Sequence, residues 1–259
     1  MALSKLQKGL IGLGIAVVAV IAVGYGGMRY LENAVVDAIR TWAAQTPQDA
    51  RVELGDVSYT LMGNHLVLKN VRMTCTTETK DTLSVAVETL DIRNPGTTLL
   101  SLLRDPKSEI KETELPVADE ISLQNVSFGP EPNITVRLRT FKGVAIETAA
   151  VKTLLDTAEG NDLKMALAIV YGLSYEEDAA SGVKITSKAM PFALSTDSAV
   201  QKSYAKGHLE SSVTNGFVFA LRGQEVLTIG EVRLENMNLP PRDVMKKLYL
   251  MDPIETSDD

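Results

Sequence analysis

The side chains that could carry out chemistry are few and are poorly placed for catalysis. The chain of 259 residues has one Cys, Cys75, and two His, His65 and His208. A zinc site built from His and Cys, or a His-based catalytic triad, needs more of these residues than the chain offers. Ser211 and Ser212 follow His208 closely, but no G-x-S-x-G motif accompanies them. We therefore expect neither a hydrolase nor a metal site.

The densest group of carboxylates is the run Glu176-Glu177-Asp178. Adjacent acidic side chains point in different directions, and their spacing is not that of a calcium-binding loop. The run is more typical of a solvated helix end. The sequence also lacks a phosphate-binding loop and a dinucleotide fingerprint. We predict that the protein is not an enzyme and needs no cofactor.

Composition and charge exclude a further class of function. Lys and Arg number 26 against 33 Asp and Glu, which gives a net charge of -7. A protein that binds nucleic acid electrostatically has the opposite balance, so we expect no nucleic-acid partner. Hydrophobic residues make up 45% of the chain and aromatic residues 5%. These values are typical of a folded protein that is rich in aliphatic side chains.

An uncharged apolar segment follows the basic N-terminus. Residues 9–28 carry no charge, and as a helix they would span about 30 Å, the thickness of the hydrocarbon core of a bilayer. Lys5 and Lys8 precede the segment, so the positive-inside rule places residues 1–8 in the cytoplasm. The segment predicts a single-pass inner (plasma) membrane anchor, with the lipid bilayer as its partner. The alternative is a cleavable signal peptide that ends at Ala22-Val23-Gly24, and both interpretations export the remainder.

Three further regions follow the predicted anchor. Residues 29–45 have apolar side chains at helical spacing and predict an amphipathic linker helix. Residues 46–251 are dominated by alternation of apolar and polar residues, which predicts an extracytoplasmic β-rich domain. A helical insertion interrupts this domain at 148–173, and 252–259 form an acidic tail. The predicted strands within the domain are 52–54, 57–61, 66–73, 82–93, 120–128, 134–144, 182–187, 192–196, 204–213, 216–221, 225–229 and 231–239.

One pattern recurs in the predicted strands: apolar, any, apolar, any, Asn, apolar, any, apolar. Its copies span 66–73, 121–128 and 232–239, and a fourth copy at 90–94 is cut short by Pro95. Successive side chains of a strand alternate between faces, so the two apolar pairs of a copy would lie on opposite faces. A bulge at the Asn would shift the alternation and keep one apolar face, and Asn tolerates the backbone of a bulge well. The alternative is that an ordinary amphipathic pattern repeats by chance.

The arrangement of these segments resembles the N-terminal region of AsmA-like envelope proteins. The resemblance rests on the anchor, the strand HLVLKNVRM (65–73), the strand VETLDIRN (87–94), the leucine-rich segment TTLLSLLRD (97–105) and ISLQNVSFGPEPNITVRL (121–138). It covers about residues 1–140, and GEVRLENMNLP (230–240) repeats part of it. The resemblance implies a periplasmic, groove-forming sheet with an apolar interior and a role in outer-membrane lipid homeostasis or phospholipid transport. This chain is shorter than the long members of that family, and the helical insertion has no match in it.

The fold class that we expect is α+β: an N-terminal transmembrane helix, then a curved, mainly antiparallel, groove-like β-sheet with a few short helices. An apolar sheet face must be covered by protein or by an apolar ligand, and phospholipid acyl chains are such a ligand. The predicted groove is lined by the apolar residues of the three full motif copies: Leu66, Leu68, Val71, Met73, Ile121, Leu123, Val126, Phe128, Val232, Leu234, Met237 and Leu239.

Three alternatives to the groove remain open at this stage. A closed sandwich, with 148–173 covering the sheet, would have the same periodicity as an open groove. A closed core would favour a non-enzymatic, membrane-anchored adaptor or a structural subunit of an envelope complex, with membrane or envelope proteins as partners. A subunit of a lipopolysaccharide-transport bridge fits less well, because the exported part is long and contains helices.

Overall fold

The computed structural model describes residues 36–37, 39–40, 43–44, 50–76, 82–96, 112–129, 133–156, 162–187, 191–241 and 244–245. The predicted anchor at 9–28, the leucine-rich segment at 97–105 and the acidic tail at 252–259 lie outside the described residues. Among the described residues, no helix has the length and apolar character that a membrane span requires.

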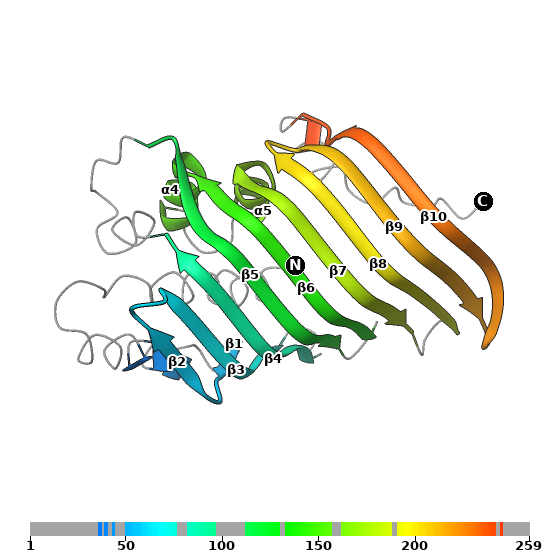
Figure 1. Cartoon of the computed structure of the whole chain (residues 1–259), viewed down its shortest axis with the longest axis horizontal. Coiled ribbons are helices and arrows are strands. Elements are labelled where there is room, and N and C mark those ends of the chain that lie inside the picture. The colour runs from blue at the N-terminus through cyan, green and yellow to red at the C-terminus, as the bar shows by residue number, and fades with distance from the viewer. Residues whose placement is uncertain are drawn as a thin grey trace, which may run out of the picture.

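One ten-stranded sheet forms most of the structure (Figure 1), and every neighbouring pair of strands is antiparallel. From β3 to β10 the order of the strands in space follows the sequence, while β1 and β2 both pair with β3. The strands are β1 (Ala50–Glu53), β2 (Val57–Thr60), β3 (His65–Thr76), β4 (Thr82–Pro95), β5 (Glu114–Gly129), β6 (Asn133–Glu147), β7 (Leu173–Thr186), β8 (Phe192–Ala205), β9 (His208–Leu221) and β10 (Gln224–Asn238).

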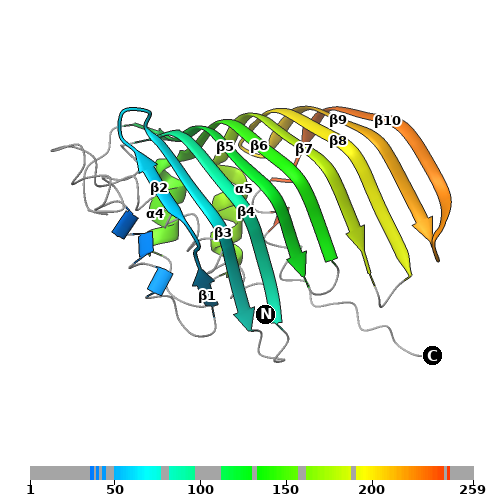
Figure 2. The same cartoon turned by 60° about the horizontal axis from the view of Figure 1, so that its bottom comes forward.

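The sheet is strongly curved and does not close on itself (Figure 2). The helices α4 (Thr148–Asp156) and α5 (Asp162–Gly172) connect β6 to β7 and lie on the concave side of the arch. Gly172 allows the two helices to pack closely, because a Cβ on this residue would lie 2.3 Å from the Cβ of Ala150. The predicted curved, mainly antiparallel sheet with a few short helices is therefore confirmed.

The hydrophobic core lies on the concave side of the first strands. Helical residues Ile39 and Ala43 pack there against the sheet, and Leu66 and Ile92 are completely buried in the same cluster. Figure 2 shows the short fragments that contain these helical residues beside β1 and β2. The inward-facing side chains of these strands thus define the apolar face of the sheet.

The motif asparagines have the backbone conformation that the sequence predicts. Asn70, Asn94, Asn125 and Asn236 all have a positive φ, between 46° and 52°. In β3, Leu66, Leu68, Val71 and Met73 are all at most 2% exposed, so the alternation of faces shifts at Asn70. The register differs from a simple bulge, because Lys69 pairs with Thr89 and Val71 with Val87, which leaves one residue unpaired in both strands. The shift therefore occurs without an extra residue in β3.

These positive-φ residues form two rows that cross the sheet. The first row contains Asn70, Asn125, Gly182 and Gly216, one in each of β3, β5, β7 and β9. The second row contains Asn94, Gly143, Ser203 and Asn236, one in each of β4, β6, β8 and β10. A residue in the left-handed region bends and twists a strand locally, so we attribute the regular curvature of the sheet to these rows.

Two predictions about the middle of the chain need correction. The helical stretch 148–173 ends at Gly172, and β7 begins at Leu173. The run Glu176-Glu177-Asp178 therefore lies in a strand and not at a helix end. The alternation is hidden there because Asp178, a charged residue, faces inward and is only 5% exposed.

Further along, the predicted breaks inside β8, β9 and β10 do not interrupt these strands, because Gly216 and other irregular residues are accommodated within them.

Candidate functional site

The apolar face continues across the sheet from β3 to β10. Residues that are directly opposite in antiparallel strands point to the same side, so the register carries the face from one strand to the next. One cross-strand row, which we call the apolar ladder, contains only apolar residues: Met73, Val85, Phe128, Ile134, Ile185, Leu194, Phe219 and Leu227. A continuous row of apolar residues therefore extends over eight strands.

The first part of this face is closed by the protein itself. Met73 and Val85 are 2% and 5% exposed, and they belong to the core cluster that includes Ile39 and Ala43. Phe128, the next residue of the ladder, is partly buried and packs against the same cluster. The protein's own side chains thus cover the apolar face from β3 to β5.

The last part of the face is more open. Ile185, Leu194 and Phe219 are only partly buried, and Leu227 is 47% exposed. In the row that begins at Leu66, the β10 residue Leu234 is also 47% exposed. We call the inward-facing side of β7 to β10 the open half of the apolar face. No residue of this half belongs to the core cluster, although Ala180 and Val183 touch its margin.

The twelve predicted groove residues divide between these two regions. The eight residues on β3 and β5 lie together, and five of them are buried at 5% exposure or less. Val232, Leu234 and Met237 lie on β10, at the other end of the sheet, and Leu239 follows that strand. Leu234 and Leu239 are exposed, and Val232 and Met237 are partly buried. The motif thus identifies the apolar face correctly, but most of its copies mark the closed part.

The sequence pattern missed the residues of β7 and β9 in the open half. Glycine replaces asparagine in these strands: Ala180-x-Gly182-Val183-x-Ile185 has the same order of apolar positions as the motif. Thr214-x-Gly216-Phe217-x-Phe219 repeats it with a Thr at the first position. Both glycines have a positive φ, like the motif asparagines. Asn and Gly both tolerate the left-handed region, but accepting either residue would not have been enough, because the first apolar position of the motif is Asp178 in β7 and Ser212 in β9.

A polar island lies on the apolar face where the closed part meets the open half. The Arg139 guanidinium donates two hydrogen bonds to the Asp178 carboxylate, at 3.1 and 2.8 Å. Its central carbon also lies 4.6 Å from the centroid of the Phe141 ring. Asp178 is buried whereas the Arg139 side chain is 44% exposed, so the pair stays in contact with solvent on one side.

Tyr175 extends this polar island toward β8. Its ring stacks on Tyr204 with centroids 5.2 Å apart, and its hydroxyl donates a hydrogen bond to Gln201 at 2.6 Å. Burial, together with the nearby Asp178 carboxylate, raises the pKa of Tyr175 to about 12. The hydroxyl therefore remains a neutral donor at physiological pH.

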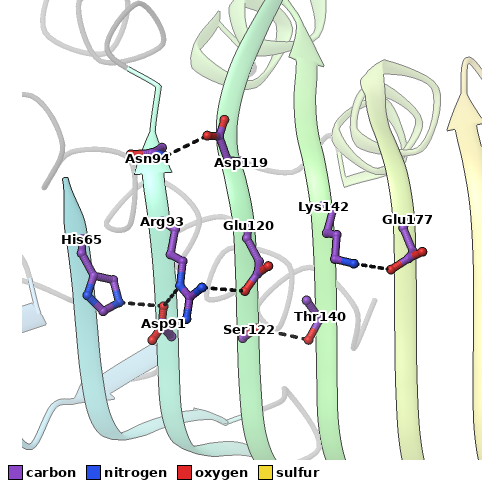
Figure 3. Close-up of polar contacts among 10 residues, drawn as sticks. All are labelled: His65, Asp91, Arg93, Asn94, Asp119, Glu120, Ser122, Thr140, Lys142 and Glu177. Atoms are coloured by element: carbon purple, nitrogen blue, oxygen red, sulfur yellow. Dashed lines mark hydrogen bonds and ion pairs between the residues drawn. The ribbon is translucent and has the colours of Figure 1, made fainter. Parts of the chain in front are cut away.

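The opposite face of the sheet carries charges of alternating sign (Figure 3). Arg93, Glu120, Lys142 and Glu177 are paired in register across four adjacent strands. The Lys142 ammonium donates to Glu177 at 2.7 Å, and Arg93 lies 3.7 Å from Glu120. The hydrogen bond and the attraction of Lys142 lower the pKa of Glu177, and the same pair raises the pKa of Lys142. This face is thus polar and solvated, in contrast to the concave one.

Two cavities of the described structure lie away from the open half. The larger one, of about 580 Å³, is lined by Arg40, Arg51, Glu53 and neighbouring residues beside β1. The smaller one, of about 250 Å³, is lined by residues beside Asn70 and Asn125 on β3 to β5.

Comparison with known proteins adds no family assignment: no family model matches the chain, and no curated protein matches it.

Proposed function

We propose that the protein is a membrane-anchored, extracytoplasmic β-sheet protein that binds lipid acyl chains along the open half of its apolar face. The observation that carries this proposal is the apolar ladder, which runs in register from the buried core to the exposed β10. Burial of apolar area stabilises a complex by about 25 cal/mol per Å², so a hydrocarbon chain is a favourable occupant of such a surface.

The chemistry of the open half suits flexible hydrocarbon chains. Ile185, Leu194 and Ile229 are aliphatic, and Phe217 and Phe219 add flat apolar area. The acidic surplus of the chain disfavours tight adsorption to anionic headgroups, so contact through acyl chains is the more favourable mode. The curvature of the sheet would bring several strands into contact with the same chain.

The polar island sets one boundary of the proposed lipid surface. An acyl chain that lay across this pair would remove the half-exposed Arg139 guanidinium from water, which is unfavourable. We place the acyl chains on the β8 to β10 side of the island and on the apolar ladder. The AsmA-like resemblance supports the same type of ligand and implies a periplasmic protein whose residues 9–28 form the anchor in the inner membrane. By binding lipid while it is anchored in the inner membrane, the protein would contribute to outer-membrane lipid homeostasis.

The experiment is site-specific photo-crosslinking in cells that express the full chain. Benzoylphenylalanine replaces Phe219, which faces inward, or its neighbour Val218, which pairs with Ser195 and Thr228 on the opposite face. We expect lipid adducts, identified by mass spectrometry, at position 219 and not at 218. The two probes are neighbours in β9 and lie at nearly the same distance from the membrane, so non-specific labelling would affect both.

Equal labelling of the two positions, or no lipid at either, would contradict the proposal. Absence of lipid at position 219 together with protein adducts there would favour the adaptor or structural subunit. A Leu227→Arg variant places a charge on the exposed end of the apolar ladder. This variant should reduce the lipid yield at position 219 while the protein still accumulates.

A further inference from the structure

β10 is a long strand at one edge of the sheet. In the part of the chain that the structure describes, it pairs with β9 alone, and it has 15 residues. The other edge is divided between β1 and β2, which have four residues each. An edge strand presents a row of unpaired backbone donors and acceptors to which another strand can add. β10 is therefore the edge at which the sheet can grow.

The charges on the polar face indicate what such a strand would carry. Arg93, Glu120, Lys142, Glu177 and Lys202 alternate in sign along one cross-strand row. The row continues through Ser211 and ends on β10 at Glu235. Cross-strand pairs of opposite charge stabilise a sheet, and like charges directly opposite destabilise it. The alternation is interrupted at the uncharged Ser211, so what a strand beyond β10 meets is Glu235 itself, and a Lys or Arg opposite it would form a favourable pair.

Arg233 and Glu231 extend this argument along β10. Both point to the polar face, as Glu235 does, and Arg233 lies 3.4 Å from Glu231. In chain order, the charges on the polar face of β10 are therefore negative, positive and negative, from Glu231 to Glu235. The complementary strand, which runs antiparallel, carries basic, acidic and basic residues at alternate positions.

The two rows of positive-φ residues fix the register of the added strand. In β9, Glu210 lies in the second row and Gly216 in the first, and β5 has Asp119 and Asn125 in the corresponding places. Each positive-φ residue of the second row, up to Ser203, has an acidic residue of the next strand opposite it. In the first of these pairs, the Asn94 amide donates a hydrogen bond to Asp119 at 2.9 Å. An added strand would thus place an acidic residue opposite Asn236, and an Asn or Gly opposite Gly230 of β10.

We propose that β10 binds an antiparallel strand of a different protein whose sequence follows the pattern acidic-basic-x-acidic-x-basic-(Asn or Gly). In this register the first residue faces Asn236, the two basic residues face Glu235 and Glu231, and the last residue faces Gly230. The x positions face Leu234 and Val232, which point to the concave side. Apolar residues at these positions would extend the apolar face of the sheet. The inference does not depend on lipid binding.

A second copy of the chain is a poorer occupant of this edge. Two β10 strands can align both rows only by placing Gly230 of each copy opposite Asn236 of the other. In that register Arg233 faces its own equivalent, and Glu231 faces Glu235. All three pairs on the polar face then have like charges, which destabilises the pairing. The charges of β10 therefore favour a partner of different sequence.

The test uses the full-length chain in detergent micelles and two fluorescent peptides as long as β10. The matched peptide follows the proposed pattern, and the reversed peptide exchanges its basic residues with the acidic residue between them. Fluorescence anisotropy should show that the wild type binds the matched peptide at least about tenfold more tightly, as expected for complementary charge pairs. The variant Glu231→Lys/Arg233→Glu/Glu235→Lys should prefer the reversed peptide.

The exchanged preference is the decisive result, because all three residues are exposed and their replacement leaves the core intact. Equal affinity for both peptides, or no binding of either one, would overturn the proposal. A wild-type chain that forms dimers by itself, and loses them when the matched peptide is added, would show that a second copy occupies the edge and would also overturn it. Crosslinking of lipid at position 219 is measured in parallel and should be the same in the charge variant.

Discussion

The two ends of the sheet share one pattern of strands but differ in how their apolar face is covered. From β3 to β5, the inward side chains are buried under the helical residues around Ile39. From β7 to β10, most residues in the same cross-strand rows remain partly exposed, and Leu227 and Leu234 are 47% exposed, although Asp178 and Ser212 are buried. The difference shows that an identical strand pattern can form a closed core or an available surface, depending on what packs against it.

The largest expected effect comes from placing an Arg on the apolar face, once in the closed part and once in the open half. Leu68→Arg buries an unpaired cation in the closed part, and we expect a loss of about 4 kcal/mol or more in the free energy of unfolding. Leu234→Arg, on the exposed β10, should change it by about 0.5 kcal/mol or less. Denaturant titration measures both. Similar losses for the two variants would show that the open half is closed in solution.

The rows of positive-φ residues give the next largest effect. Gly216→Val forces a β-branched residue into a φ of 63°, where its Cβ would lie 2.1 Å from an Asp197 oxygen. We expect a loss of about 3 kcal/mol from strain and steric conflict, measured by denaturant titration. Gly230→Ala is the matched control, because Gly230 has open space around it and an ordinary φ. If the control loses as much as the variant, the cost does not come from the first row.

The polar island separates the two regions, and its removal should have a moderate effect. Asp178→Ala leaves the Arg139 guanidinium without its buried partner, and we expect a loss of about 2 kcal/mol in the free energy of unfolding. The double variant Arg139→Leu/Asp178→Leu should regain most of this loss, because apolar residues can replace a buried ion pair. Thermal unfolding of the three proteins checks this order. A double variant that is weaker than Asp178→Ala would show that the pair itself stabilises the fold.

The smallest effect concerns the polar face, which is solvated at both ends. Pairing with Lys142 lowers the pKa of Glu177, so its contribution is present above the pKa of an unfolded Glu and is lost as pH falls through the lowered value. The raised pKa of Lys142 gives a contribution that is present below the pKa of an unfolded Lys and is lost as pH rises through the raised value. Both groups are exposed, so the change in unfolding midpoint should be small and sensitive to salt. A Glu177→Gln variant should lose the acidic part of this dependence, and an unchanged pH profile would contradict the assignment.

The strand alternation and the motif asparagines made much of the fold predictable. Asn70 and Asn125 predicted where the alternation of faces shifts, and their positive φ agrees with that prediction. The pattern could not predict that β4 compensates at Glu88, because a register without an extra residue depends on both strands of a pair. It also failed at β7, where Asp178 occupies an inward position of a strand and the sequence predicted a solvated helix end.

The extent of the candidate site was harder to predict than the face itself. Leu68 and Leu234 occupy equivalent places in the motif, yet one is 2% exposed and the other is 47% exposed. What separates them is the tertiary packing of residues such as Ile39, which lies outside every copy of the motif. Local periodicity contains no information about such long-range cover.

The two rows also determine how this architecture can vary in size. Each strand from β3 to β10 contributes one left-handed residue to the rows, and the spacing between the rows is the same, from 119 to 125 in β5, from 176 to 182 in β7 and from 210 to 216 in β9. A duplicated hairpin with that spacing could be inserted without altering the width of the arch. Chains of this kind can therefore lengthen by whole hairpins while the cross-section of the arch stays constant.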